Sequence, residues 1–325
     1  MANTKLAIFP ASGGLGGATL EHLFRSEKAN PKDVVLVARS PERLETYRKL
    51  GVDIRKADFD QAESLKHAFD GVKVLNLISY ASIQHEHRFN VHKLAIDAAI
   101  ASGVEHVVYS SLAFAGPPSS TTTVAQVMKA HIQTELYLAS LHAANPTKFT
   151  YTILRQGIYS ESFPIYLAFF SLSSPPPDNR IKIPHDGSVP GIAWAKRDEL
   201  GEATAKLLLL AFNNHDSFTP FRNTTSTLSG PKVYTLNETV EILGRQIGRD
   251  VKIEEVTVEE YASQPKVQEG LSYGSGQWAT LWATAFEGIR KGETGNVTRT
   301  LETILGRTPE SFEKTVEDLA RQGEK

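Results

Sequence analysis

Residues 6–17 read Leu-Ala-Ile-Phe-Pro-Ala-Ser-Gly-Gly-Leu-Gly-Gly, a short apolar run followed by a glycine-rich turn. A helical pattern follows, from about residue 18 to residue 26. Glycines between a strand and a helix let the backbone approach a pyrophosphate, and the helix start offers free N–H groups and the positive end of its dipole. A tight turn without a ligand is the alternative. The context favours a nucleotide site formed by Ala11, Ser12, Gly13, Gly14, Leu15 and Gly16.

Apolar runs alternate with helical patterns beyond this turn. Strand-like runs lie at 34–38, 52–54, 72–78, 107–109 and 149–154. Most are continuously apolar, which is typical of a parallel sheet covered by helices on both faces. The sequence therefore predicts an α/β fold: a doubly wound parallel sheet of the Rossmann type, with a second, smaller α/β substrate lobe. The expected nucleotide-binding lobe is 1–155 plus about 188–236, and the substrate lobe about 156–187 plus 237–325.

The second half of the chain is less regular. Helical patterns lie near 197–212, 237–248, 276–291 and 309–322, and short strand patterns at 232–235 and 251–256.

Composition excludes several classes of protein. The 325 residues are 41% hydrophobic and 22% charged, with a formal net charge of −2, which argues against a nucleic-acid-binding surface over the whole molecule. The absence of cysteine excludes disulfides, zinc–thiolate sites and a cysteine nucleophile. The first residues do not resemble a signal peptide, and no apolar stretch approaches the length of a membrane span. We expect a soluble cytoplasmic protein, monomer or dimer, that binds a small hydrophobic substrate.

The end of the second strand indicates which dinucleotide binds. A fold that prefers NAD usually has a carboxylate there, on the ribose 2′-hydroxyl. This chain instead has Val37-Ala38-Arg39-Ser40, and an arginine can bind the 2′-phosphate of NADP with two hydrogen bonds. A surface arginine on a loop is the alternative. We predict NADP(H) as the cofactor, with Arg39 among its ligands.

The order of several motifs resembles the NmrA-like family of atypical short-chain dehydrogenases, which is related to isoflavone-reductase-like and quinone-reductase-like proteins. Gly13 and Gly16 match the second and third glycines of the family's G-x-x-G-x-x-G motif, and Pro10 stands at the first. Other similar stretches are 38–39, 56–60, 97–104, 106–111, 153–157, 194–200 and 305–312. The resemblance implies that Asp58 and Phe59 lie near the adenine. It also implies that Leu77, Ile78 and Ser79 lie near the ribose and nicotinamide.

Short-chain dehydrogenases that reduce carbonyls typically use Ser, Tyr and Lys, with the tyrosine four residues before the lysine. That spacing puts both on one helix face, where the ammonium lowers the phenol pKa and holds the ribose. Lys129 stands on the corresponding helix, predicted over 124–144, but Ala125 replaces the tyrosine. Relatives of the isoflavone-reductase type keep such a lysine without the tyrosine. We predict Lys129 at the cofactor and the reacting oxygen, and Ser111 on the substrate oxygen, with a solvated lysine as the alternative.

The placement of Lys129 depends on the apolar stripe of this helix. The expected stripe is Val124, Met128, Ile132, Leu136, Ala139 and Ala143. Lys129 lies about 100° around the helix from Met128, on the shoulder of that stripe. His131 diverges from Lys129 by about 200°, so we do not expect the two to serve one pocket.

Aromatic residues are candidate walls of a substrate pocket, with simple packing as the alternative for each: Tyr80, Phe114, Tyr159 and Phe163. His85, His87 and His92 contain no i/i+4 pair, so no metal site is predicted.

Two functions follow from these features. The first is an enzyme in which NADPH delivers a hydride to an enone, quinone or carbonyl of a hydrophobic small molecule. The missing tyrosine and Pro10 favour the alternative, a non-catalytic NAD(P)-binding redox sensor of the NmrA type that acts through a partner protein.

Overall fold

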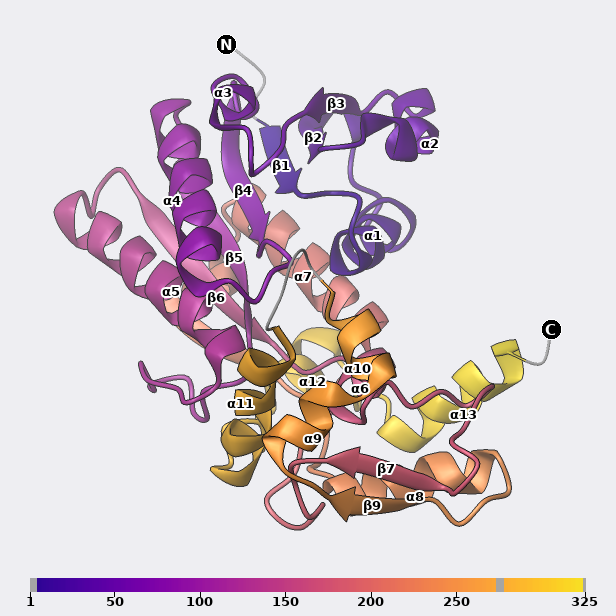
Figure 1. Cartoon of the computed structure of the whole chain (residues 1–325). Helices are drawn as coiled ribbons and strands as arrows, with labels where there is room; N and C mark the ends of the chain where they lie inside the picture. The colour runs from indigo at the N-terminus through magenta and orange to yellow at the C-terminus, as the bar shows by residue number, and fades with distance from the viewer. Residues whose placement is uncertain (1–4, 273–277, 324–325) are drawn as a thin grey trace. The chain divides into compact units, whose positions relative to one another are not determined.

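The computed structural model describes residues 5–272 and 278–323 (Figure 1). The chain forms two compact units. The first unit is Met1–Leu112, Ala130–Gln156 and Arg197–Ser226, and the second is Ala113–Lys129, Gly157–Lys196 and Thr227–Lys325. These bounds differ from the predicted lobes, because residues 113–129, 188–196 and 227–236 belong to the second unit. The assignment of one lobe to the cofactor and the other to the substrate stays a prediction.

A seven-stranded sheet in the order β3-β2-β1-β4-β5-β6-β8 organises the first unit. The strands are β1 Lys5–Phe9, β2 Val34–Ala38, β3 Asp53–Lys56, β4 Val72–Ile78, β5 His106–Leu112, β6 Thr150–Gln156 and β8 Thr224–Leu228. All neighbouring pairs from β3 to β6 are parallel. The strand order reverses between β1 and β4, which is where ligands bind in open α/β sheets, at the carboxyl ends of the strands. The Rossmann-type prediction is confirmed.

Helices cover both faces of this sheet (Figure 1). On one face lie α4 (His85–Ala101) and α5 (Gln126–Ala144), and on the other lie α1 (Gly14–Glu21) and α7 (Arg197–Phe212). Apolar side chains of β1, β2, β4, β5 and β6 form one core cluster with side chains of α4 and α5. On the other face, α1 and α7 approach closely because Gly201 has no side chain. A Cβ built on Gly201 would stand 2.6 Å from the Ala18 Cβ. The short helices α2 (Glu45–Lys49) and α3 (Ala62–Leu65) complete this unit.

The helix after the glycine turn begins earlier than predicted. It starts at Gly14 and continues past Glu21 as one π-helical turn over His22–Ser26. The Gly17 N–H bonds the Gly13 carbonyl at 2.7 Å, so the glycines themselves form the first turn. The glycine run is therefore both the turn and the helix N-terminus.

The second unit contains a two-stranded parallel sheet and several helices. The strands are β7 Arg180–Ile183 and β9 Lys252–Glu255. The helices are α6 Phe163–Tyr166, α8 Leu236–Gln246, α9 Val258–Ser263, α10 Pro265–Gly270, α11 Trp278–Arg290, α12 Thr300–Leu305 and α13 Phe312–Gly323. The strand predicted at 232–235 is wrong, since only a single bridge joins Tyr234 to Ile192. Residues 276–277 of the predicted helix lie outside the described residues.

No helix in the described parts of the chain is both long enough and apolar enough to cross a membrane.

Candidate functional site

The glycine turn leaves the start of α1 open. Gly13 is the N-cap residue, with φ −92° and ψ 178°, no side chain caps this end, and no acidic residue stands in the first turn. Gly13 is exposed, and a Cβ built on it would have no atom within 4 Å. A Cβ on Gly16 would instead stand 2.7 Å from the Ala11 carbonyl oxygen, so only glycine fits there. The amide end of α1 is thus accessible to an anion.

Arg197 lies against this turn and was not predicted as a site residue. It begins α7, and its Nη1 lies 3.0 Å from the position of a Cβ on Gly14. A guanidinium and a helix N-terminus side by side both favour negative charge, so an anion at this turn would meet two favourable partners. The sequence signal for this residue was the 194–200 motif, which does not show that the Arg197 guanidinium lies beside the glycine turn.

The loop after β3 is held by internal contacts. The Asp58 Oδ1 accepts the Asp60 N–H at 3.1 Å, so this carboxylate caps its own turn. Phe59 is buried, and its ring centroid lies 4.3 Å from that of Phe9. The adenine contacts of Asp58 and Phe59 stay a prediction.

Tyr80 brings several predicted residues together at the carboxyl ends of the strands. Its hydroxyl donates to the Asp60 Oδ2 at 2.7 Å. Burial above all, then the Asp60 and Asp58 carboxylates, raise the pKa of Tyr80 to about 12, while Arg39 opposes them. Arg39 after β2 and the two carboxylates after β3 therefore all act on Tyr80, which lies just after β4. The Tyr80 phenol stays protonated at neutral pH.

Ser79 also has internal partners. Its Oγ accepts hydrogen bonds from the Arg88 Nε at 3.0 Å and Nη2 at 2.7 Å. Leu77 is fully buried in the core cluster, and Ile78 is half-buried. Any contact of Ser79 with a ligand therefore falls mainly to its backbone, and the predicted contacts of these three residues remain untested.

Ser111 belongs to a buried charged cluster. Its hydroxyl donates to the Glu135 Oε1 at 2.6 Å. Glu135 also receives two hydrogen bonds from Arg155, at 3.0 Å from Nε and 2.6 Å from Nη2, and all three side chains are buried. With its hydrogen directed at Glu135, Ser111 offers lone pairs rather than a proton. Its predicted contact with the substrate oxygen stays a prediction, and no sequence motif indicated the Glu135–Arg155 pair.

Lys129 is exposed, and the expected stripe on its helix is wrong in part. Leu136 is 50% exposed, whereas the polar residues His131, Thr134 and Glu135 are buried. Since α5 turns these polar side chains toward the core, hydropathy alone misplaced the buried face. The role of Lys129 stays a prediction.

The other candidate pocket residues lie in the second unit. Phe114 is fully buried, with its ring centroid 6.4 Å from that of Tyr166. Phe163 packs edge-on against Phe312 at 6.3 Å. Tyr159 is half-buried, and its backbone bridges to Ala195. Packing accounts for the contacts of both phenylalanine rings, and the substrate roles stay predictions.

The described residues contain no group of three or more histidine or acidic side chains arranged to hold a metal ion. His85 contacts Gln133 at 2.7 Å and His87 contacts Asp60 at 2.8 Å, in hydrogen bonds of their own.

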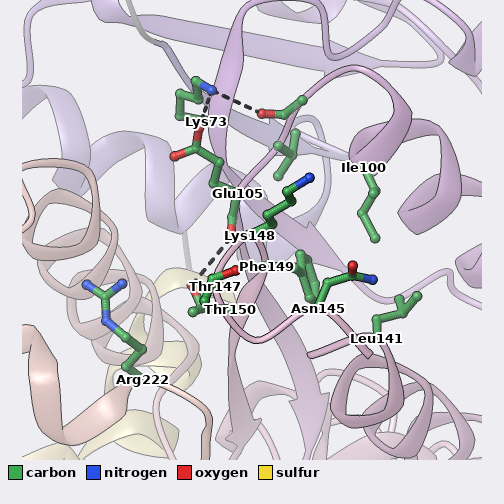
Figure 2. Close-up of a pocket in the computed structure, with 12 residues that line it drawn as sticks. Lys73, Ile100, Glu105, Leu141, Asn145, Thr147, Lys148, Phe149, Thr150 and Arg222 are labelled. Atoms are coloured by element: carbon green, nitrogen blue, oxygen red, sulfur yellow. Dashed lines mark hydrogen bonds and ion pairs between the residues drawn. The ribbon is translucent and has the colours of Figure 1, made fainter. Parts of the chain in front are cut away.

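One pocket of the first unit, of about 670 Å³, lies at the opposite edge of the sheet (Figure 2). It is lined by Lys73, Glu105, Lys148, Phe149, Thr150, Arg222 and neighbours near the amino ends of β4, β5 and β6. Lys73 bonds Glu105 across it. Because dinucleotides bind at the carboxyl ends of the strands, this pocket is separate from the candidate site.

With this geometry in view, comparison with known proteins places the chain in a family. The model of the NmrA-like family matches residues 2–273. The chain belongs to the NmrA-like family. It is 28% identical over 309 residues to an NmrA-like family domain-containing oxidoreductase of Aspergillus flavus, covering 93% of this chain and 90% of that protein. The resemblance drawn from the motifs is confirmed.

Two solved structures that are similar to this chain contain a bound coenzyme. The NADPH-dependent quinone oxidoreductase of Escherichia coli, complexed with NADPH, is 25% identical with a TM-score of 0.75, covering 97% of this chain and 99% of that one. The triphenylmethane reductase of Citrobacter sp., complexed with NADP(H), is 26% identical with a TM-score of 0.72, over 97% of this NmrA-like chain and 99% of that chain.

Proposed function

We propose that this NmrA-like protein is an NADPH-dependent oxidoreductase that transfers a hydride to an enone, quinone or carbonyl group of a hydrophobic small molecule. The observation that carries the proposal is the open helix N-terminus at Gly13, beside Arg197, where the strand order reverses. The bound coenzymes of the quinone oxidoreductase and the triphenylmethane reductase support it.

The residues of the first unit suit the two anionic parts of NADPH. The amides that begin at Gly13 and the Arg197 guanidinium would hold the pyrophosphate. The exposed Arg39 at the end of β2 would bind the 2′-phosphate that distinguishes NADPH from NADH. The open space at Gly13 is the room that a phosphate needs. When bound, the coenzyme supplies the hydride and the protein supplies position and charge.

Lys129 is the proposed cation at the reacting oxygen. Hydride addition leaves negative charge on that oxygen, which an ammonium stabilises before a proton arrives. Once that oxygen is protonated, the Ser111 Oγ would accept a hydrogen bond from the new hydroxyl, since the proton of Ser111 itself goes to Glu135. Without a tyrosine at Ala125, the proton comes from Lys129 or from water.

Ala125 is also the observation that favours the second candidate, a redox sensor without turnover. It directly precedes α5, is completely buried and carries no phenol.

Steady-state oxidation of NADPH with a panel of quinones and enones tests the proposal, alongside calorimetric titration with NADPH and NADP⁺. We expect turnover with at least one acceptor, and a fall in kcat of about 100-fold in Lys129→Ala. The matched control is Lys148→Ala, an exposed lysine of the separate pocket, which should leave kcat unchanged. Binding of both coenzymes without turnover on any acceptor would favour the sensor, and absence of binding would refute both functions.

A further inference from the structure

A buried polar network lies between the sheet and helices α4 and α5 of the first unit. Its members are Arg88 and His92 of α4, Tyr109 of β5, and His131 and Thr134 of α5. The two histidines and Tyr109 are at most 3% exposed, and Arg88 is 7% exposed. The proposed chemistry uses none of these side chains. Buried polar groups are costly, so a network of this size requires an explanation.

The donors of this network determine the form of His131. The Arg88 Nη2 lies 2.8 Å from the His131 Nε2, and a guanidinium only donates. Nε2 is therefore the acceptor, and the hydrogen is on Nδ1, which donates to the Tyr109 hydroxyl at 3.0 Å. His131 is thus neutral with one assigned tautomer.

The same reasoning applies to His92. The backbone N–H of Tyr80 donates to the His92 Nε2 at 2.8 Å. The His92 hydrogen is therefore on Nδ1 and is donated to the Thr134 Oγ1 at 2.9 Å. Thr134 in turn donates to the Ala130 carbonyl at 2.8 Å. An accepting nitrogen exists toward Tyr80 only while His92 is neutral.

These contacts meet at two consecutive residues. Arg88 holds the Ser79 Oγ with two hydrogen bonds, and His92 holds the Tyr80 N–H. The last paired residue of β4 is Ile78, opposite Ser110, so the sheet no longer positions Ser79 and Tyr80. Side chains of α4 position this short segment instead.

We propose that His92 and Arg88 are positioning residues of the coenzyme site, which hold the backbone of Ser79 and Tyr80 where the nicotinamide half of the dinucleotide lies. This inference rests on the proposed function. The carboxyl end of β4 adjoins the reversal of strand order, on the side opposite β2 and β3, which take the adenosine half. An anchored segment presents its backbone groups to the ligand at no ordering cost.

Charged and titratable groups approach His92 from several elements. Arg88 approaches from α4, Tyr109 from β5 and His131 from α5, while Phe59 packs on its ring. Asp60 engages the Tyr80 hydroxyl and His87. Burial first, and then the Arg88 charge, hold the pKa of His92 well below its usual value.

Two substitutions of His92 test the proposal, one that keeps a hydrogen-bond acceptor for the Tyr80 N–H and one that removes it. In His92→Gln the side-chain oxygen can accept the Tyr80 N–H, whereas in His92→Phe nothing can. We expect His92→Phe to weaken NADPH binding about tenfold or more, the effect of orphaning one buried N–H, and His92→Gln to stay within about threefold of wild type. Amide hydrogen exchange at Tyr80 should be fast in His92→Phe and slow in His92→Gln. The control is His85→Gln on the same helix, whose hydrogen bond goes to Gln133, and which should leave binding unchanged.

The measured affinities distinguish a failure of the proposed function from a failure of this inference alone. If the wild type does not bind NADPH, the proposed function fails and this inference with it. If the wild type binds NADPH and both His92 variants bind it as tightly as the wild type does, the inference alone fails. A purely structural role of His92 would lower the melting temperature and leave the affinity unchanged. If His92→Phe does not fold, Thr134→Val removes the Nδ1 acceptor instead. It should weaken NADPH binding and accelerate Tyr80 exchange, and wild-type values for both would overturn the inference.

Discussion

Acidification should destabilise the first unit through three buried histidines. His92, His106 and His131 all belong to that unit and are at most 5% exposed. Burial, and then a nearby arginine, lowers the pKa of each, and that of His106 falls to about 3. Each therefore stays neutral in the folded state at pH 5, while its unfolded counterpart, with a pKa near 6.5, takes up a proton.

Proton linkage gives the sign and size of this change in the free energy of unfolding. Below pH 6.5 the unfolded state binds more protons, so the free energy of unfolding is highest above that pH and falls as the pH decreases. From pH 7 to pH 5 each histidine lowers it by about 1.9 kcal/mol, so the three lower it by about 6 kcal/mol. That loss is comparable to the whole stability of a typical domain.

The measurement must report the first unit. Trp194, Trp278 and Trp282 all belong to the second unit, so tryptophan fluorescence is unsuitable. Hydrogen exchange of β5 peptides across a urea series at pH 7, 6 and 5 gives the required free energies. His106→Gln should reduce the pH slope by about a third, and the exposed His67→Gln should not change it. A loss below about 2 kcal/mol between pH 7 and pH 5, or equal slopes in the two variants, would refute the reasoning.

Further expected outcomes concern the site. Arg39→Ala should weaken NADPH binding at least about tenfold and leave NADH binding nearly unchanged, because only NADPH carries the 2′-phosphate. Arg197→Ala should weaken the binding of both coenzymes alike, because both contain the pyrophosphate. Calorimetric titration measures these affinities, and equal effects of Arg39→Ala on both coenzymes would contradict its assignment. Gly16→Ala should lower the free energy of unfolding by about 1–3 kcal/mol in urea, because its Cβ would stand 2.7 Å from a carbonyl oxygen. Gly17→Ala has open space for its Cβ and should raise that free energy by up to about 1 kcal/mol, because alanine has the higher helix propensity. Glu135→Gln should cost about 3–5 kcal/mol in the same assay, because a buried guanidinium loses its carboxylate; a cost below about 1 kcal/mol would argue against that ion pair.

The first βα unit was predictable because its signals are local. A strand, a glycine turn and a helix follow one another within residues 5–21, and each is specified by its own stretch of chain. The place of Arg39 was predictable for the same reason, because it directly follows a recognisable strand, while its contact with the coenzyme stays a prediction. The misplaced start of α1 reflects a run of glycines, whose low helix propensity is overridden by the packing of α1 on α7.

Long-range partners were not predictable. Arg197 reaches Gly14 only because α7 packs on α1, far along the chain. On α5, the sequence predicted Leu136 inside and gave no reason to bury His131 and Glu135. A polar residue on a helix normally faces water, and it becomes buried only when other elements supply its hydrogen bonds.

The sequence by itself thus determined the α/β fold, the family, the place of the glycine turn and the cation at the end of β2, because periodicity, glycine spacing and strand order are properties of neighbouring residues. Only the tertiary structure decided which polar side chains are buried and what they hold: Arg88 and His92 beneath Ser79, and Glu135 between Ser111 and Arg155. Those hydrogen bonds join groups far apart in the chain, and their strength depends on the exclusion of water that folding alone provides.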